Sequence, residues 1–161
     1  MQAKEGVVDY LNRLLTNELT AINQYFLQAE IVESQGFPRL YRAMKRLAFE
    51  EMKEAEEMIE HILYLEGMPN LQRLGPVNIG ENVEEHLRAD LELERGQDRL
   101  LSVAIDHCSR AGDYTTRTLL ERKIAEERLH IDWVETQLDT IGLVGLPNYL
   151  TQQMKDTDAG E

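Results

Sequence analysis

Four long stretches of the sequence repeat their apolar residues at intervals of three and four, and glycine and proline punctuate the joints between them. The stretches run from about Val7 to Ser34, from about Arg39 to Leu65, from about Val83 to Arg110 and from about Asp113 to Ile141. This interval is that of an amphipathic α-helix rather than of a strand. Each stretch has roughly 27–30 residues, or about 40–45 Å of helix. Four helices of matched length predict an all-α four-helix bundle.

The joints between the predicted helices differ in length, and that difference predicts how the helices are connected. The first and third joints, around Gly36 and Gly112, are short and join antiparallel neighbours. The second joint, residues 66–82, is long enough to run the full height of the bundle and to bury four apolar side chains: Leu71, Leu74, Val77 and Ile79. One long crossover between two tight hairpins is the ferritin-like connectivity.

The length and the charge of the chain limit what it can be. A chain of 161 residues has the size of one compact domain, and we expect a single ferritin-like domain over residues 1–161, with the bundle over about 7–141 and a short C-terminal fifth helix over about 147–155. Acids outnumber bases by 30 to 17, which disfavours nucleic acid as a partner because phosphate binding needs clustered Lys and Arg. The single cysteine, Cys108, excludes an intrachain disulfide. With neither a signal peptide nor a membrane-spanning run expected, a cytoplasmic location is predicted.

Acidic side chains interrupt the apolar seam near the middle of each predicted helix. They are Glu18, Glu51, Glu94 and Glu127, and His130 follows Glu127 at a spacing of three on the same helix face. An unpaired carboxylate inside a bundle costs several kcal/mol, so carboxylates that face one another need cations between them. A single acid on a seam is more often a side chain that reaches solvent. Four of them with a correctly spaced histidine predict a metal site.

The donor set indicates which metal this site would hold. Two of the helices contribute one glutamate each, and the other two contribute a Glu-x-x-Glu pair, Glu51 and Glu54, and a Glu-x-x-His pair, Glu127 and His130. Di-iron carboxylate bundles use this layout, with Glu-x-x-His at both paired positions. Hard oxygen donors with few imidazoles suit iron or manganese rather than copper or structural zinc. The remaining histidines are interpreted as surface or packing residues: His61, His86 and His107.

Several sequence blocks resemble a known family. They are NELTAINQYF around Glu18, EEMKEAEEMIEHILYLEGMPNLQ around Glu51, EERLHIDWVETQLD around Glu127, and LPNYL near the short fifth helix. From about residue 7 to Met154 the chain resembles bacterioferritin, and the blocks agree with that family in order and spacing. The family's fold, a four-helix bundle with a short fifth helix, agrees with the fold predicted from periodicity.

The resemblance implies iron storage inside a hollow shell of 24 subunits that is built from twofold dimers. Each subunit of the family carries a di-iron ferroxidase centre that oxidises Fe(II) with O2 or peroxide, and ferric mineral accumulates inside the shell. Matched by motif, the di-iron ligands here would be Glu18, Glu51, Glu94, Glu127 and His130, with Glu51 and Glu127 bridging. For iron release, the family implies a ferredoxin-type reductant as a partner.

The resemblance also implies haem b on the twofold axis of a dimer, with its iron between one methionine from each subunit. The matching residue is Met52, which follows a seam glutamate and therefore points about 100° away from the core. An axial methionine would help to set the potential of the haem iron, and electrons leaving through haem could reduce stored Fe(III). The alternative is an ordinary interface methionine.

Further residues match positions of the family that lie around the metal or at the subunit interface. Tyr25 and Trp133 match positions near the di-iron centre, where they could carry an oxidising equivalent, although both could equally be core aromatics. Three acids resemble the lining of a pore between subunits that could attract Fe(II), with a solvated acidic face as the alternative: Glu66, Asp132 and Asp139.

The sequence departs from the family at Glu54, where the family has a histidine. Glu54 could ligate iron and give a site with more negative charge, or the site could bind its second iron poorly. In the second case the chain would act mainly through haem, as a cage subunit that co-assembles with an active sister subunit. We expect Fe(II) oxidation to persist at a reduced rate. Gln28 and Arg46 also stand where the family often has histidine. A smaller di-iron enzyme or a dodecameric mini-ferritin is disfavoured, because all four helices of one chain supply the ligands.

Overall fold

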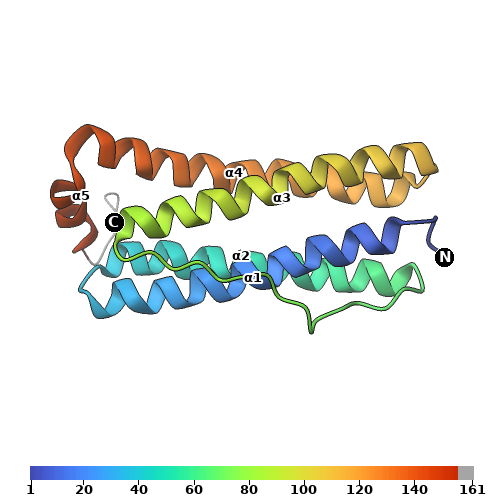
Figure 1. The fold of residues 1–161 in the computed structure, drawn as a ribbon, viewed down its shortest axis with the longest axis horizontal. Coiled ribbons are helices and arrows are strands. Elements are labelled where there is room, and N and C mark those ends of the chain that lie inside the picture. The colour runs from blue at the N-terminus through green and yellow to red at the C-terminus, as the bar shows by residue number, and fades with distance from the viewer. Residues whose placement is uncertain (156–161) are drawn as a thin grey trace.

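The computed structural model describes residues 1–155 as helices joined by turns and one long crossover (Figure 1). The helices are α1 (Val7–Ser34), α2 (Pro38–Tyr64), α3 (Val83–Ala111), α4 (Tyr114–Val144) and α5 (Leu146–Gln153). Helices α1 and α2 form one antiparallel hairpin, and α3 and α4 form a second hairpin beside it. The predicted all-α bundle with one long crossover and a short fifth helix is confirmed, and residues 1–155 contain no strand.

Three residues fix the start of α3 and the turn between α3 and α4. Asn82 caps α3 by accepting a hydrogen bond from the backbone N–H of Glu85 at 2.9 Å. Gly112 ends α3 with φ at 72°, a left-handed conformation that glycine adopts without the steric cost of a Cβ atom. Asp113 then caps α4, because its side chain accepts from the backbone N–H of Thr116 at 3.0 Å.

The crossover, residues 65–82, runs the full height of the bundle along α1 (Figure 1). Polar side chains of α1 hold it by accepting hydrogen bonds from its backbone N–H groups. The pairs are Asn12 Oδ1 with Asn70 at 2.8 Å, Thr20 Oγ1 with Gly75 at 2.9 Å, and Gln24 Oε1 with Asn78 at 3.1 Å.

The apolar side chains of the crossover are mostly uncovered. Leu71, Leu74 and Val77 keep 38–52% of their surface exposed, so the prediction that they are buried within the chain is wrong, and only Ile79 is half-buried. The physical reason is that α1 meets the crossover with polar side chains that bind its backbone. Backbone contact of that kind leaves the side chains of the crossover facing outward.

Two apolar clusters fill the two ends of the bundle. One includes Leu11, Met58 and Leu101, and the other includes Val32 and Leu87. The seam acids of the four long helices lie between these clusters. The core therefore supports a polar layer from both sides and keeps it away from solvent.

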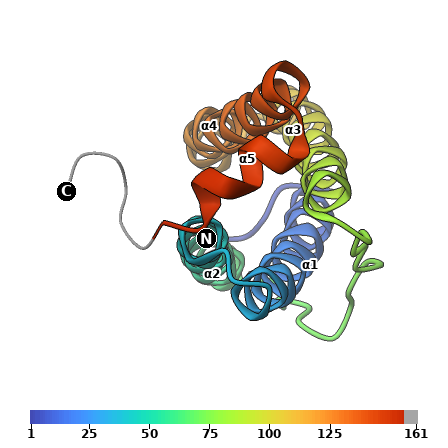
Figure 2. The same cartoon turned by 90° about the vertical axis from the view of Figure 1, so that its left-hand side faces the viewer.

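The short helix α5 lies across one end of the bundle, where it contacts both α4 and α2 (Figure 2). Tyr149 anchors α5, because its side chain is buried and its hydroxyl donates to Gln137 Oε1 at 2.9 Å. A groove of about 1010 Å³ separates α2 from α4 and reaches His130 near the middle of the bundle. Within residues 1–155, no helix has the length and apolar character needed to cross a membrane.

Candidate metal centre

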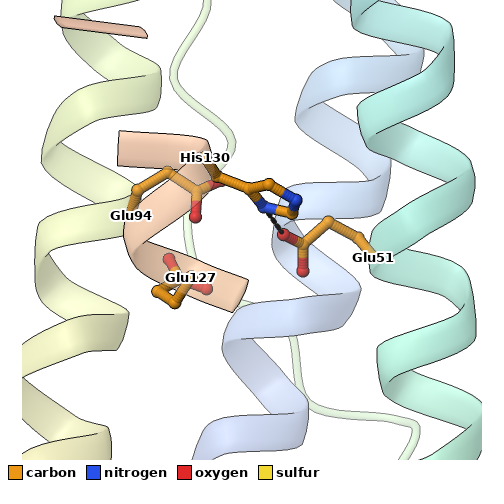
Figure 3. A group of neighbouring side chains, drawn as sticks. All are labelled: Glu51, Glu94, Glu127 and His130. Atoms are coloured by element: carbon orange, nitrogen blue, oxygen red, sulfur yellow. Dashed lines mark hydrogen bonds and ion pairs between the residues drawn. The ribbon is translucent and has the colours of Figure 1, made fainter. Parts of the chain in front are cut away.

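Three glutamates and one histidine meet in the middle of the bundle. Glu51 comes from α2, Glu94 from α3, and Glu127 and His130 from α4 (Figure 3). One ligand atom from each of the four residues lies within 4.8 Å of the others. The three glutamates are buried, and each lies on the apolar seam of its helix. The helical interval that builds the core therefore also brings these four side chains together.

Hydrogen bonds orient three of these four side chains. The Nδ1 atom of His130 lies 3.2 Å from Glu51 Oε1, and its Nε2 atom lies 2.8 Å from Oε2 of Glu50, which lines the groove. Tyr25 is fully buried, and its hydroxyl donates to Glu94 Oε1. A ligand held by a second partner keeps its orientation when a metal binds. Glu50 was not predicted as part of the site, although it stands directly before Glu51 and four residues before Glu54.

Burial makes this cluster costly without a cation. Burial raises the pKa of Glu127 well above its ordinary range, and Glu94 adds to the effect. Burial also raises the pKa of Glu51 to about 7. Burial by itself would lower the pKa of His130, but Glu51, Glu94 and Glu50 outweigh it and raise that pKa to about 9. A divalent cation would reverse these effects and release the protons, because metal ligands must be deprotonated.

The other two predicted ligands, Glu18 and Glu54, face a buried lysine. Lys123 of α4 has 2% of its side chain exposed, and its Nζ atom lies 3.8 Å from Glu18 Oε1. The same ammonium donates to the Glu54 carboxylate and to the Glu54 backbone oxygen at 3.0 Å. Burial lowers the pKa of Lys123, but Glu18, Glu54 and Glu57 outweigh that effect and raise it, so the side chain carries a positive charge.

Sequence reasoning missed Lys123, although the signal was present. Lys123 lies three residues after Leu120 and four before Glu127, both of which are buried. That spacing puts Lys123 on the seam of α4. Lysine is almost never fully buried unless it is paired, so its position among seam acids indicates an internal ion pair.

The remaining predicted residues lie around the cluster or on the surface. Met52 is 49% exposed on α2, and Trp133 is half-buried beside His130 in the groove between α2 and α4. Arg46 is exposed and lines the same groove. The three predicted pore acids are exposed: Glu66, Asp132 and Asp139.

A second group of buried polar side chains lies further along α1 and α3. Gln24 Nε2 donates to Asp90 Oδ1 at 2.8 Å, and burial raises the pKa of Asp90 to about 7. Gln28 donates to the backbone oxygen of His86 at 3.3 Å. His86 is 1% exposed, and among residues 1–155 neither of its ring nitrogens has a hydrogen-bond partner. His86 is therefore a packing residue rather than a surface residue.

The residues present fit one metal ion better than two. Glu51, Glu94, Glu127 and His130 converge as three carboxylates and one imidazole, and Glu127 Oε1 is buried without a partner in the described chain. The Glu18 and Glu54 side of the site already contains an ammonium. Lys123 also lines the small cavity between Glu18, Glu54 and His130.

A four-helix bundle with one long crossover and a central carboxylate–histidine cluster defines a ferritin-like protein. Residues 8–144 match the family described as ferritin-like domain. The bacterioferritin of Mycobacterium tuberculosis is 41% identical over 152 residues, which cover 94% of this chain and 96% of that protein. The bacterioferritin of Streptomyces coelicolor is 40% identical over 157 residues, covering 98% and 94% of the two chains. That of Brucella melitensis is 37% identical over 149 residues, covering 92% of each. The chain therefore belongs to the bacterioferritin family, as the sequence blocks predicted.

Proposed function

We propose that this chain stores iron as a subunit of a 24-subunit shell, and that it binds and oxidises Fe(II) at the cluster of Glu51, Glu94, Glu127 and His130. Fe(II) is the substrate, O2 or peroxide takes its electron, and the Fe(III) product enters a stored mineral. One observation carries the proposal: three buried carboxylates and one imidazole converge on one point. This donor set suits iron. The proposed location of the protein is the cytoplasm.

The residues of the cluster have different roles in this proposal. The three carboxylates bind Fe(II) and stabilise Fe(III) more strongly, because their attraction grows with the charge of the ion. His130 supplies the imidazole, and Glu50 at 2.8 Å keeps its ring turned toward Glu51. Loss of one electron from Fe(II) is therefore favoured by the fixed negative charge around it.

Fe(II) and the oxidant reach the cluster through the groove between α2 and α4. Glu50 and Glu126 line this groove next to His130, and three basic side chains line it as well: Arg39, Arg46 and Lys53. Trp133 lines the same groove, and Tyr25 contacts Glu94 on the inner side. We propose that these two aromatic side chains donate electrons when the iron supplies too few to reduce the oxidant completely.

The outer face of the α1–α2 hairpin is the proposed site of haem b between two copies of the chain. Met52, Phe49 and Phe26 are 49–53% exposed. Phe49 and Met52 lie three residues apart on one face of α2, and Lys45 of the same face lies 4.2 Å over the Phe26 ring of α1. An exposed apolar face of this kind is typical of an interface. Met52 would hold the haem through its thioether sulfur, and the bound haem would supply one-electron redox chemistry.

The haem proposal is tested by adding haem to the purified protein and recording the Soret band. Met52→Leu is expected to abolish the shift of that band which binding through the Met52 sulfur would produce. The matched control is Met68→Leu, since Met68 is 78% exposed and lies on the crossover. Equal spectra for the wild type and the Met52 variant would contradict the assignment.

A second candidate function rests on the contact between Lys123 and Glu54. In this alternative the chain is a haem-binding cage subunit with an impaired ferroxidase centre, and an active sister subunit in a mixed shell oxidises most of the iron. A ferredoxin-type reductant then returns electrons through haem to release the iron. The two functions differ in whether the homopolymer by itself oxidises Fe(II).

The deciding experiment is aerobic oxidation of Fe(II) by the purified homopolymer. Size exclusion first tests whether the 18.6 kDa chain forms the 24-subunit shell. Glu94→Gln is expected to reduce the rate of Fe(III) formation at least tenfold. Glu92→Gln removes an exposed acid of the same helix and is expected to leave the rate unchanged. If the Glu94→Gln protein oxidises Fe(II) at the wild-type rate, the cluster does not carry out the oxidation.

A further inference from the structure

We propose that Lys123 takes the place of one ion of a di-iron centre, so that each subunit binds a single metal ion between Glu51, Glu94, Glu127 and His130. The inference rests on the proposed function, because it specifies how many ions the same site holds. It comes from a residue that lies outside the six predicted ligands.

The ammonium of Lys123 is surrounded by oxygens in the way that a bound cation would be. Its Nζ atom lies 3.0 Å from the Glu54 backbone oxygen, 3.5 Å from Glu57 Oε2 and 3.8 Å from Glu18 Oε1, and it also contacts the Glu54 carboxylate. An ammonium has three donors and no acceptor, so these oxygens satisfy it. With 2% of the side chain exposed, the positive charge is confined to this position.

These contacts divide the six predicted ligands into a group of two and a group of four. Glu18 and Glu54 face the ammonium, whereas the other four ligands converge to within 4.8 Å of one another without them. A small cavity of about 10 Å³ is lined by residues of both groups. Lys123 lines this cavity together with Glu18 and Glu54, so the ammonium borders it on that side.

A second divalent ion between Glu18 and Glu54 would meet the ammonium at close range. Repulsion between like charges is strong in a buried site because the surroundings screen it weakly. Lys123 also donates to the backbone oxygen of Glu54. A metal ion that bound the Glu54 carboxylate would leave this second contact of the ammonium in place. Glu54 and Lys123 thus form an ion pair where a histidine and a metal ion would otherwise be neighbours.

A site with one ion has a definite consequence for the oxidation. Each Fe(II) that becomes Fe(III) gives up one electron, and the reduction of O2 to hydrogen peroxide takes two electrons and two protons. A one-ion subunit supplies half of these electrons in one binding event. The other electron must come from Tyr25 or Trp133, or from a second Fe(II) that is bound at another subunit or after the first has left.

The number of bound ions is measured with Co(II) on the intact wild-type assembly. We expect one Co(II) per subunit after desalting, and one anomalous peak per subunit in Co(II)-soaked crystals, bounded by the four convergent ligands. Lys123→Leu is expected to bind two, a twofold increase. The matched control is Arg122→Leu, since Arg122 is the neighbouring cation, is half-exposed and contacts Glu57 and Glu126. This variant is expected to keep one.

The outcomes separate the inference from the function on which it rests. Two peaks in the wild-type crystals, or a single peak between Glu18 and Glu54, would overturn the inference while leaving metal binding intact. No Co(II) at the bundle centre would overturn the proposed function itself. The wild-type crystals decide the question even if Lys123→Leu does not fold. A Lys123→Leu protein that folds and still binds one ion would also count against the inference.

Discussion

The buried carboxyl of Asp90 makes the stability of the protein depend on pH in a direction that can be worked out. Burial raises its pKa from the ordinary 3.8 to about 7, against hydrogen bonds from Gln24 and Gln28 that lower it. The unfolded chain therefore releases this proton near pH 4, whereas the folded chain keeps it up to about pH 7. Between those values the folded state binds the additional proton, so stability falls as pH rises.

The magnitude follows from the difference in pKa. About three pH units at about 1.4 kcal/mol each give a cost of about 4 kcal/mol above pH 7. Asp90→Asn keeps the shape and the bond from Gln24 but does not titrate. Its stability relative to the wild type should increase by about 2–3 kcal/mol between pH 5 and pH 8.

The assay is urea unfolding followed by circular dichroism, at matched protein concentration, at pH 5 and pH 8. The control is Asp106→Asn, which removes an exposed carboxyl from the same helix. This variant should change the free energy of unfolding by the same amount at pH 5 and at pH 8. If Asp90→Asn and the wild type lose stability in parallel across this range, the carboxyl is not buried as a neutral acid and the reasoning fails.

Three further substitutions test local features by the same unfolding assay at pH 7. Asp113→Ala removes the side-chain acceptor of Thr116 and should cost about 0.5–2 kcal/mol, and an unchanged midpoint would mean that the cap is not formed. Gly112→Ala should cost about 1 kcal/mol because φ is 72° although a Cβ meets no atom there, and a stabilised variant would contradict that backbone conformation. Tyr25→Phe removes the donor to Glu94 in the metal-free protein and should cost about 1–3 kcal/mol; no loss would show that this hydrogen bond is absent.

Much of the fold could be predicted from the sequence because the signals are local. The spacing of apolar residues gave the first helix as Val7–Ser34, with the bounds that the structure has. The short joints at Gly36 and Gly112 gave the two hairpins, since a short joint leaves little choice of partner. The seam acids could be found in the same way, because a helix puts residues three and four apart on one face.

The partners of buried charges could not be predicted to the same extent. The contact of Lys123 with Glu54 joins residues 69 positions apart, so it depends on how α2 and α4 face each other. The same is true of His130 and Glu50, which are 80 positions apart. Periodicity places each residue on a face of its own helix, and only the packing of helices decides which faces meet.

The crossover ties its backbone to α1 and leaves Leu71, Leu74 and Val77 uncovered. A row of exposed apolar side chains along the crossover is a feature that a neighbouring copy can recognise. Changes in the residues of the crossover can therefore alter this exposed face during evolution without disturbing the helices that carry the candidate metal ligands.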